Sequence, residues 1–232
     1  MADPATGFEV PDQMYYLRNG INEPLHGTTP ALKVEEVALG AITKLLETYA
    51  LTPPPPTNRQ NSNPCRKTGT IELPLWEHTA TVNSKSPNWE AYQTFMQAIA
   101  PVIESASTLL STYQKTKFDE ARFHLELHEM SQDPATCLPQ HASNNCFERI
   151  KLTINMALPP APLRTSHRSP WIFVTLCGTW LGGDMDFGDV EGLPSMHRAS
   201  AGDVVVVKDG VLVGGKPFSG ERYQLELFLP DV

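Results

Sequence analysis

The last third of the chain alternates short apolar runs with turns that are rich in glycine and aspartate. Runs with this punctuation, and with no helical spacing between them, are typical of antiparallel β structure. The expected strands are, in order, Trp171–Cys177, a strand that begins at Gly182 after a turn, the four valines that follow Gly202-Asp203, a short segment that ends at Val213, and an alternating strand from Gly220 to Leu229.

Two stretches have the spacing of amphipathic helices. Residues 31–50 place apolar side chains on one stripe, and a second stripe runs from Ser86-Pro87 to about Lys117. Pro101 lies inside the second stretch, where it removes a backbone donor. We therefore expect this proline to kink or split the helix.

Three further stretches alternate between apolar and polar residues and predict strands. Thr70–Leu75 is an expected edge strand that stops at Pro74, and residues 148–158 form a longer alternating run. In the third stretch, residues 122–130, one face carries Phe123, Leu125 and Leu127, whereas the other carries His124, Glu126 and His128.

Prolines and small polar residues mark the segments between these elements. Residues 1–30 hold Pro, Gly and Asn at short intervals and are expected to wrap the surface as an arm. Residues 51–70 contain four consecutive prolines and predict an extended linker, and residues 159–170 predict a proline-rich loop. A chain of 232 residues is expected to form one compact domain, with a helical support region at 31–121 and a β core at 122–232.

The charge balance limits the range of partners. The chain has 18 Lys and Arg residues against 26 Asp and Glu residues, and its net charge of −8 argues against a nucleic-acid partner. No apolar run reaches the roughly 18 residues of a membrane helix, and the N-terminus lacks the layout of a signal peptide. The four cysteines have no CxxC spacing and are expected to be free thiols. We expect a cytoplasmic protein without a membrane partner, and its oligomeric state stays open.

The order of the C-terminal strands resembles the C-terminal half of the Fe(II)/2-oxoglutarate oxygenases. Proteins of that family fold as a double-stranded β-helix, also called a jelly roll. The resemblance implies an α+β fold with a mainly β, cupin-like core and N-terminal helices packed on one sheet. By the family's spacing from Gly202, a metal-binding histidine would fall at Val213, and the arginine that anchors 2-oxoglutarate would fall at Arg222.

The iron ligands that the resemblance implies are altered. Such enzymes hold iron with two histidines and one carboxylate. His141 and Ser143 occupy the place of the family's HxD motif, and Val213 occupies the place of the second histidine. No histidine lies between Lys208 and Gly220, so a slip of one residue restores nothing. The resemblance therefore implies a lost iron triad, with His141 as its one surviving position.

The anchor for the 2-oxoglutarate carboxylate is also changed. In the family the arginine is followed two residues later by Ser or Thr, and here Gln224 follows Arg222. A guanidinium still suits an anionic ligand, because its fork binds a carboxylate with two hydrogen bonds. The alternative is that Arg222 pairs with a nearby Asp or Glu and only stabilises the barrel.

The polar face of residues 122–130 is a second candidate site. Two imidazoles that are two residues apart on a strand can converge on one metal ion, and His141 could join His124 and His128. Without metal, these histidines and Glu126 could transfer protons. The alternative is that this face is solvated and the face with Phe123 is buried.

Three functions remain open at this point, and whether the protein is an enzyme stays open with them. The favoured one is an oxygenase-fold protein without the iron triad or any cofactor, which binds a small polar or anionic molecule and could catalyse a metal-free isomerase, cyclase or lyase step. The second is an active dioxygenase with Fe(II) and 2-oxoglutarate, whose atypical ligands would be His141, His124 or His128, and Asp184 or Glu126. The third is an interaction module that uses the proline-rich segments 51–64 and 159–170.

Overall fold

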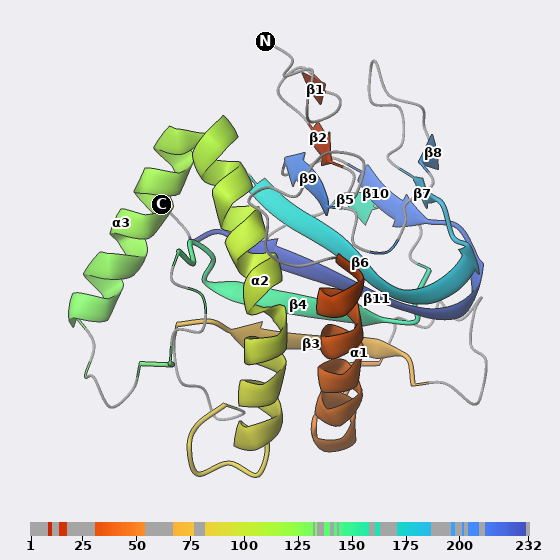
Figure 1. Cartoon of the computed structure of the whole chain (residues 1–232), viewed down its shortest axis with the longest axis horizontal. Coiled ribbons are helices and arrows are strands. Elements are labelled where there is room, and N and C mark those ends of the chain that lie inside the picture. Colours follow the sequence, from red (N-terminus) through yellow and green to blue (C-terminus); the bar gives the residue numbers. More distant parts are fainter. Residues whose placement is uncertain are drawn as a thin grey trace.

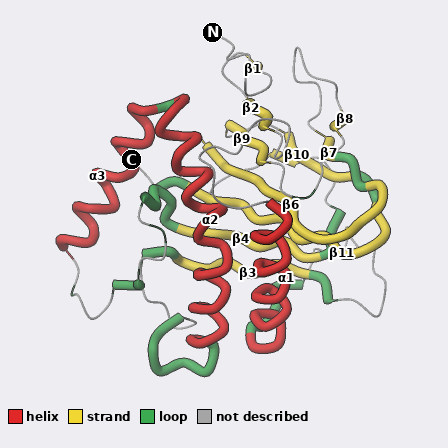
Figure 2. The backbone as a smooth tube through the Cα atoms, in the orientation of Figure 1, coloured by secondary structure: helices red, strands yellow, loops and turns green. Residues whose placement is uncertain are grey.

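The described part of the computed structural model contains three helices and two antiparallel sheets. The structure describes residues 9–10, 14–17, 31–53, 67–76, 82–131, 133, 137–139, 142, 144–157, 161–162, 171–186, 196–197, 201, 204–208 and 212–230. The helices are α1 (Ala31–Thr48), α2 (Trp89–Tyr113) and α3 (Lys115–Ser131). Helices and sheets form separate layers, with α1 and α2 lying across one side of the strands (Figures 1 and 2).

The larger sheet has seven strands and the smaller sheet has four. In spatial order the larger sheet holds β1 (Glu9–Val10), β2 (Met14–Leu17), β9 (Val204–Lys208), β6 (Trp171–Gly182), β11 (Phe218–Phe228), β4 (Arg149–Ile154) and β3 (Gly69–Pro74). The smaller sheet holds β5 (Ala161–Pro162), β10 (Leu212–Gly215), β7 (Met185–Asp186) and β8 (Met196–His197).

One face of the larger sheet packs on the helices. Alternate residues of β3, β4 and β11 point to this side, among them Leu73, Leu152 and Leu225, and all three belong to the main hydrophobic core. Ile42 of α1 and Phe95 of α2 belong to the same core and are fully buried. Each such side chain contributes roughly 1.5–3 kcal/mol through its removal from water. The opposite face of the sheet is therefore the one that looks into the barrel.

Several sequence predictions are confirmed. The helix expected at residues 31–50 is α1, the edge strand expected at 70–75 is β3, and the run at 148–158 contains β4. The first 30 residues do more than wrap the surface, because β2 pairs with β9 at the end of the larger sheet. Among the described helices, none combines the length and the apolar character that a bilayer span requires.

The turn predicted after Cys177 is wrong, because β6 continues without interruption to Gly182. Gly178, the next residue, has a φ of 119° within the strand. A glycine adopts this backbone conformation readily, and the strand keeps its pairing with β11 through this residue. The glycine that resembled a turn signal lies instead within a long, continuously paired strand.

Of the two effects expected of Pro101, a kink or a split, the split does not occur. α2 runs through this proline to Tyr113, and the helix ends at Gln114, where φ and ψ are −138° and 56°. Pro101 is exposed, so its ring lies on the solvent side of the helix. The hydroxyl of Ser105 donates a hydrogen bond to the Pro101 carbonyl oxygen at 2.8 Å, one turn further on.

The strand predicted at residues 122–130 is wrong, because these residues belong to α3. Ala121 and Leu125 are the buried residues of this helix, and their spacing is one helical turn. Phe123 is 62% exposed and Leu127 is 49% exposed, so the apolar half of the apparent alternation is not a buried face. The β core therefore does not begin at residue 122, and residues 122–131 belong to the helical part of the chain.

Candidate functional site inside the barrel

Arg222 is the central residue of the candidate site. It lies on β11 and is only 4% exposed. Its Nη1 donates a hydrogen bond to the Gly183 carbonyl oxygen at 2.7 Å, and its Nη2 donates one to the Met156 carbonyl oxygen at 3.1 Å. The guanidinium carbon also lies 4.2 Å from the centre of the Phe218 ring. These contacts fix the guanidinium from three sides.

Two glycines make room for this guanidinium. A Cβ on Gly183 would lie 2.8 Å from Nη1, and a Cβ on Gly215 would lie 2.8 Å from Nη2. Gly215 belongs to β10 of the smaller sheet, so the side chain of Arg222 reaches from the larger sheet to the smaller one. The site therefore lies between the two sheets, inside the barrel.

The backbone of Arg222 is held by the end of β4. Its amide donates a hydrogen bond to the side-chain oxygen of Asn155 at 2.9 Å, and the Asn155 amide donates one to the Arg222 carbonyl oxygen at 2.8 Å. Asn155 has a φ of 50°, a conformation that asparagine tolerates better than most residues. The pairing fixes the position from which the Arg222 side chain starts.

The electrostatics of Arg222 favour an anionic ligand. Burial lowers its pKa to about 10, which leaves the guanidinium charged at neutral pH. Among the described residues no carboxylate pairs with this guanidinium, whose two hydrogen bonds go to neutral carbonyl groups. The described structure therefore does not contain the Arg222–carboxylate pair that the alternative interpretation required, and a buried positive charge attracts an anion strongly.

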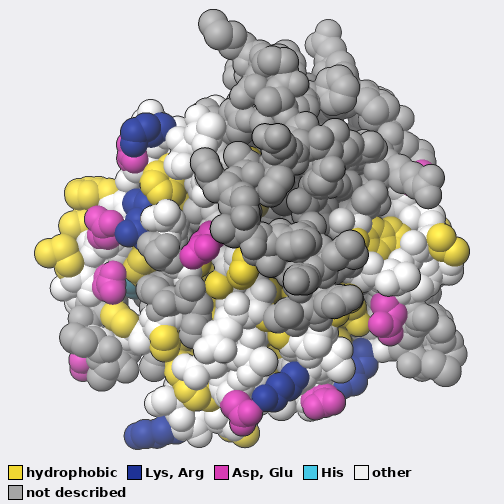
Figure 3. Space-filling view, viewed as in Figure 1, with side chains coloured by type: hydrophobic (Ala, Val, Ile, Leu, Met, Phe, Trp, Pro, Cys, Tyr) yellow, Lys and Arg dark blue, Asp and Glu magenta, His cyan; other side chains and the backbone are white. Residues whose placement is uncertain are grey.

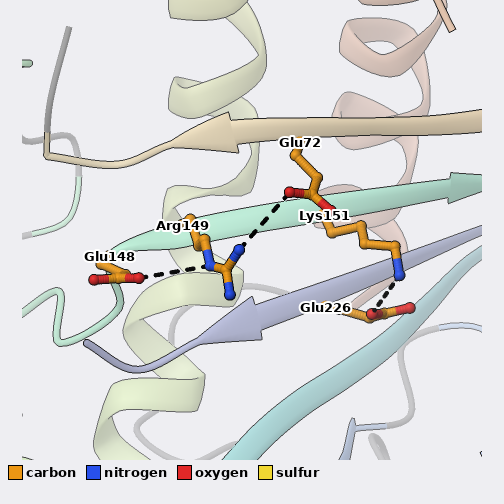
Figure 4. A network of polar contacts seen from close by, with 5 residues as sticks. All are labelled: Glu72, Glu148, Arg149, Lys151 and Glu226. Atoms are coloured by element: carbon orange, nitrogen blue, oxygen red, sulfur yellow. Dashed lines mark hydrogen bonds and ion pairs between the residues drawn. The ribbon is translucent and has the colours of Figure 1, made fainter. Parts of the chain in front are cut away.

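Gln224 and Glu226 follow Arg222 on the same face of β11. The side-chain amide of Gln224 donates a hydrogen bond to Glu226 at 2.9 Å, and Lys151 of β4 lies 3.2 Å from the other Glu226 oxygen. Glu226 is fully buried, and Figure 4 shows its carboxylate beside the Lys151 ammonium, with the helices behind the sheet. Gln224 thus orients Glu226 rather than reaching toward Arg222.

Sequence reasoning missed Glu226, although the strand contains a signal. Polar side chains recur at Arg222, Gln224 and Glu226, while Tyr223 and Leu225 between them are buried in the helix-facing core. A second ion-paired group lies further along the same face, where Arg149 approaches Glu72 and Glu148 at 3.8 and 3.5 Å (Figure 4). Pairs this long and partly exposed contribute little to stability.

The second candidate site, predicted on a strand, does not form on α3. It consisted of His124, Glu126 and His128. Residues 124 and 128 lie one turn apart on α3, whereas residue 126 projects to the other side of the helix. His124 and Glu126 are exposed, and Glu126 accepts a hydrogen bond from Arg122 at 2.9 Å. The helix removes the geometric basis for a common catalytic site of these three residues.

The residues that the sequence assigned to the metal site are described only in part. His141 and Ser143 lie outside the described residues, and Val213 is described only as the backbone partner of Ala161. Asp186 pairs with Lys216 at 3.3 Å. Among the described residues, no three His, Cys, Asp or Glu side chains are placed so that they could hold a metal ion.

The placement of His141 loses its support together with the strand at 122–130. The family order is a strand, a proline- or glycine-rich turn and then the HxD motif, and β4 followed by residues 159–170 is the stretch that has this order. By sequence order, His167-Arg168-Ser169 is a second candidate for the HxD position. These residues lie outside the described part of the chain.

Comparison with known proteins bears on the fold. No protein-family model and no curated protein matches this sequence. The chain is similar to the solved structure of NgTET1 in complex with 5mC DNA, with a TM-score of 0.52 and 14% identity over 93% of this chain and 71% of that chain. It is also similar to OsALKBH1, with a TM-score of 0.43 and 9% identity over 98% and 100% of the two chains. A Pseudomonas putida prolyl-4-hydroxylase is similar with a TM-score of 0.44 and 16% identity over 88% and 89%.

These likenesses concern the fold. The chain has the double-stranded β-helix fold of the Fe(II)/2-oxoglutarate oxygenases, as the order of its C-terminal strands predicts. At 14% identity the match does not transfer an activity, a substrate or a ligand set. The function has to be argued from the residues of the site itself.

Proposed function

We propose that this protein binds a small organic anion through Arg222 and does so without the iron site of the oxygenases. The observation that carries the proposal is a buried guanidinium that faces the inside of the barrel and pairs with no carboxylate of the described residues. Burial in a low-dielectric interior strengthens the attraction between such a cation and an anion.

The donor groups argue against Fe(II). An iron site of this fold needs two imidazoles and a carboxylate. Residues 208–220 contain no histidine, and both candidate HxD positions, His141-Ala142-Ser143 and His167-Arg168-Ser169, end in a hydroxyl. A serine hydroxyl is a poor ligand for Fe(II) at neutral pH. The residues present do not fit the metal, so any chemistry on the bound anion would be metal-free and would depend on positioning and proton transfer.

The proposed ligand is not a nucleic acid. NgTET1 was solved with 5mC DNA, but this chain carries a net charge of −8, and DNA binding needs a basic surface. On the described part of the face seen in Figure 3, basic and acidic side chains lie intermixed. Lys44 pairs with Glu90 at 2.7 Å. A small carboxylate fits the buried charge of Arg222 better than a polyanion does.

The test is a binding titration. We expect at least one of 2-oxoglutarate, succinate and pyruvate to bind the wild-type protein in isothermal titration calorimetry without added metal. Arg222→Lys keeps the charge but removes the fork, so it should weaken that binding at least tenfold. Lys216→Met, which removes a half-exposed cation, is the matched control and should bind as the wild type does.

Circular dichroism of Arg222→Lys checks that the barrel is intact, because this side chain also holds two backbone carbonyls. Elemental analysis of the purified protein tests the second half of the proposal. Iron present in stoichiometric amounts, together with succinate formation from 2-oxoglutarate, would contradict it. Equal binding by the wild type and by folded Arg222→Lys would contradict the role of Arg222.

A further inference from the structure

Thr153 of β4 lies on the barrel-facing side of the larger sheet. Its register partner is Gln224, which shares a face of β11 with Arg222, and directly paired residues project to the same side of a sheet. Its chain neighbours Leu152 and Ile154 both belong to the helix-facing core. Thr153 therefore points to the same side of the larger sheet as Arg222.

The Thr153 hydroxyl is buried and unpartnered. The residue is 2% exposed, and its Oγ1 has no hydrogen-bond partner in the described structure. A buried hydroxyl in this state costs free energy that proteins usually avoid. An unpaired hydroxyl at this position therefore requires an explanation.

The neighbouring polar groups are already used. Lys151, two residues before Thr153, pairs with Glu226. The Asn155 side chain, two residues after it, bonds the Arg222 amide and the Lys67 carbonyl oxygen. The amide nitrogen of Gln224 is directed to Glu226. Thr153 is thus the one polar residue of this stretch of β4 whose side chain has no described partner, and it lies opposite Gln224 on the same side of the sheet as Arg222.

From this arrangement we infer that Thr153 is a second ligand-binding residue, whose hydroxyl donates a hydrogen bond to a carboxylate that Arg222 holds. The inference rests on the proposed function and names the ligand group as a carboxylate. The oxygenases place a Ser or Thr two residues after the arginine, and this chain has Gln224 there. Because directly opposite residues have Cβ atoms about 5 Å apart, Thr153 can supply from β4 the hydroxyl that β11 lacks.

The experiment compares Thr153→Val, which keeps the shape and removes the hydroxyl, with Thr153→Ser, which keeps the hydroxyl. The probe is whichever of 2-oxoglutarate, succinate and pyruvate binds the wild type most tightly. We expect Thr153→Val to weaken binding about tenfold, as the loss of a hydrogen bond to a charged group would. Thr153→Ser should stay within about threefold of the wild type.

A stability measurement separates this role from a structural one. Since the hydroxyl has no partner in the described structure, the urea midpoint of ligand-free Thr153→Val should equal or exceed that of the wild type. Thr175→Val is the matched control, because Thr175 is also buried but pairs with Leu225 on the helix-facing side of the sheet. It should leave the affinity for the probe unchanged.

The remaining outcomes distinguish a failure of the Thr153 role from a failure of anion binding by the protein. If Thr153→Val binds as the wild type does while Arg222→Lys does not, Thr153 has no role in binding and the proposed function stands. If ligand-free Thr153→Val unfolds at lower urea, its hydroxyl serves the fold and the inference fails. If the wild type binds none of the three probes, the inference and the proposed function fail together.

Discussion

The two faces of β11 have different roles. Tyr223, Leu225 and Leu227 point to the helices and are buried in the main hydrophobic core. Arg222, Gln224 and Glu226 point into the barrel, and the first and last of these are buried as charged groups. The helix-facing side stabilises the fold through apolar burial, whereas the barrel-facing side buries polar groups that each need a partner. Burying charged groups contributes little to stability by itself. Their presence on one face of β11 therefore indicates a binding site on that face.

The largest effect is expected on the helix-facing side. Leu225→Ala removes a fully buried side chain from the centre of the core and should lower the free energy of unfolding by about 3 kcal/mol. Urea denaturation followed by circular dichroism measures this loss. Affinity for the carboxylate probe should not change in the folded protein, and a large change there would mean that the two faces are not independent.

A smaller loss of about 2 kcal/mol is expected for Lys151→Met on the barrel-facing side. This change leaves the buried Glu226 carboxylate without its cation. The loss is less than for a fully buried pair because the Lys151 side chain is 25% exposed. The double variant Lys151→Met with Glu226→Leu should recover most of the stability in the same assay. If the double variant is no better than the single one, Glu226 is not the reason for the loss.

The smallest of the three effects on stability is expected at Gly183. A Cβ there would approach both Nη1 of Arg222 and the Phe218 side chain at 2.8 Å, in a backbone conformation with a φ of 74°. Gly183→Ala should therefore cost about 1–2 kcal/mol, and it should weaken anion binding because it displaces the guanidinium. Gly40→Ala in α1 is the control, since a Cβ there meets nothing within 4 Å. It should raise the unfolding free energy by about 0.5–1 kcal/mol, and equal effects at the two glycines would contradict the close packing around Arg222.

The same division explains what the sequence could predict. The helix-facing positions of β4, and those of β11 between Arg222 and Leu227, alternate with polar residues, so period-two patterning is enough to predict these strands. Arg222 could be predicted because its spacing from Gly202 along the chain follows a family pattern. The role of Thr153 and the pairing of Glu226 with Lys151 could not, because they depend on which residues of two distant strands lie opposite each other.

The error at α3 has a different cause. Over nine residues, Phe123, Leu125 and Leu127 satisfy a period of two, although only Leu125 is buried. The helical signal lies in pairs one turn apart, such as Lys115 with Asp119 and Arg122 with Glu126. Met130 is 84% exposed, and like Phe123 and Leu127 it is an apolar residue on the solvent side of the helix. Apolar residues on that side weaken the amphipathic pattern by which the sequence would indicate a helix.

The contacts of Arg222 join parts of the chain that are far apart in sequence. Its two carbonyl partners lie 39 and 66 residues before it. Contacts of such long range form late, because the loops between them have to close first. A nascent chain that ends before β11 therefore lacks Arg222, and affinity for the proposed anion should arise only when the last strand enters the sheet. Ligand binding would then favour the completed barrel over every shorter or partly folded form of the protein.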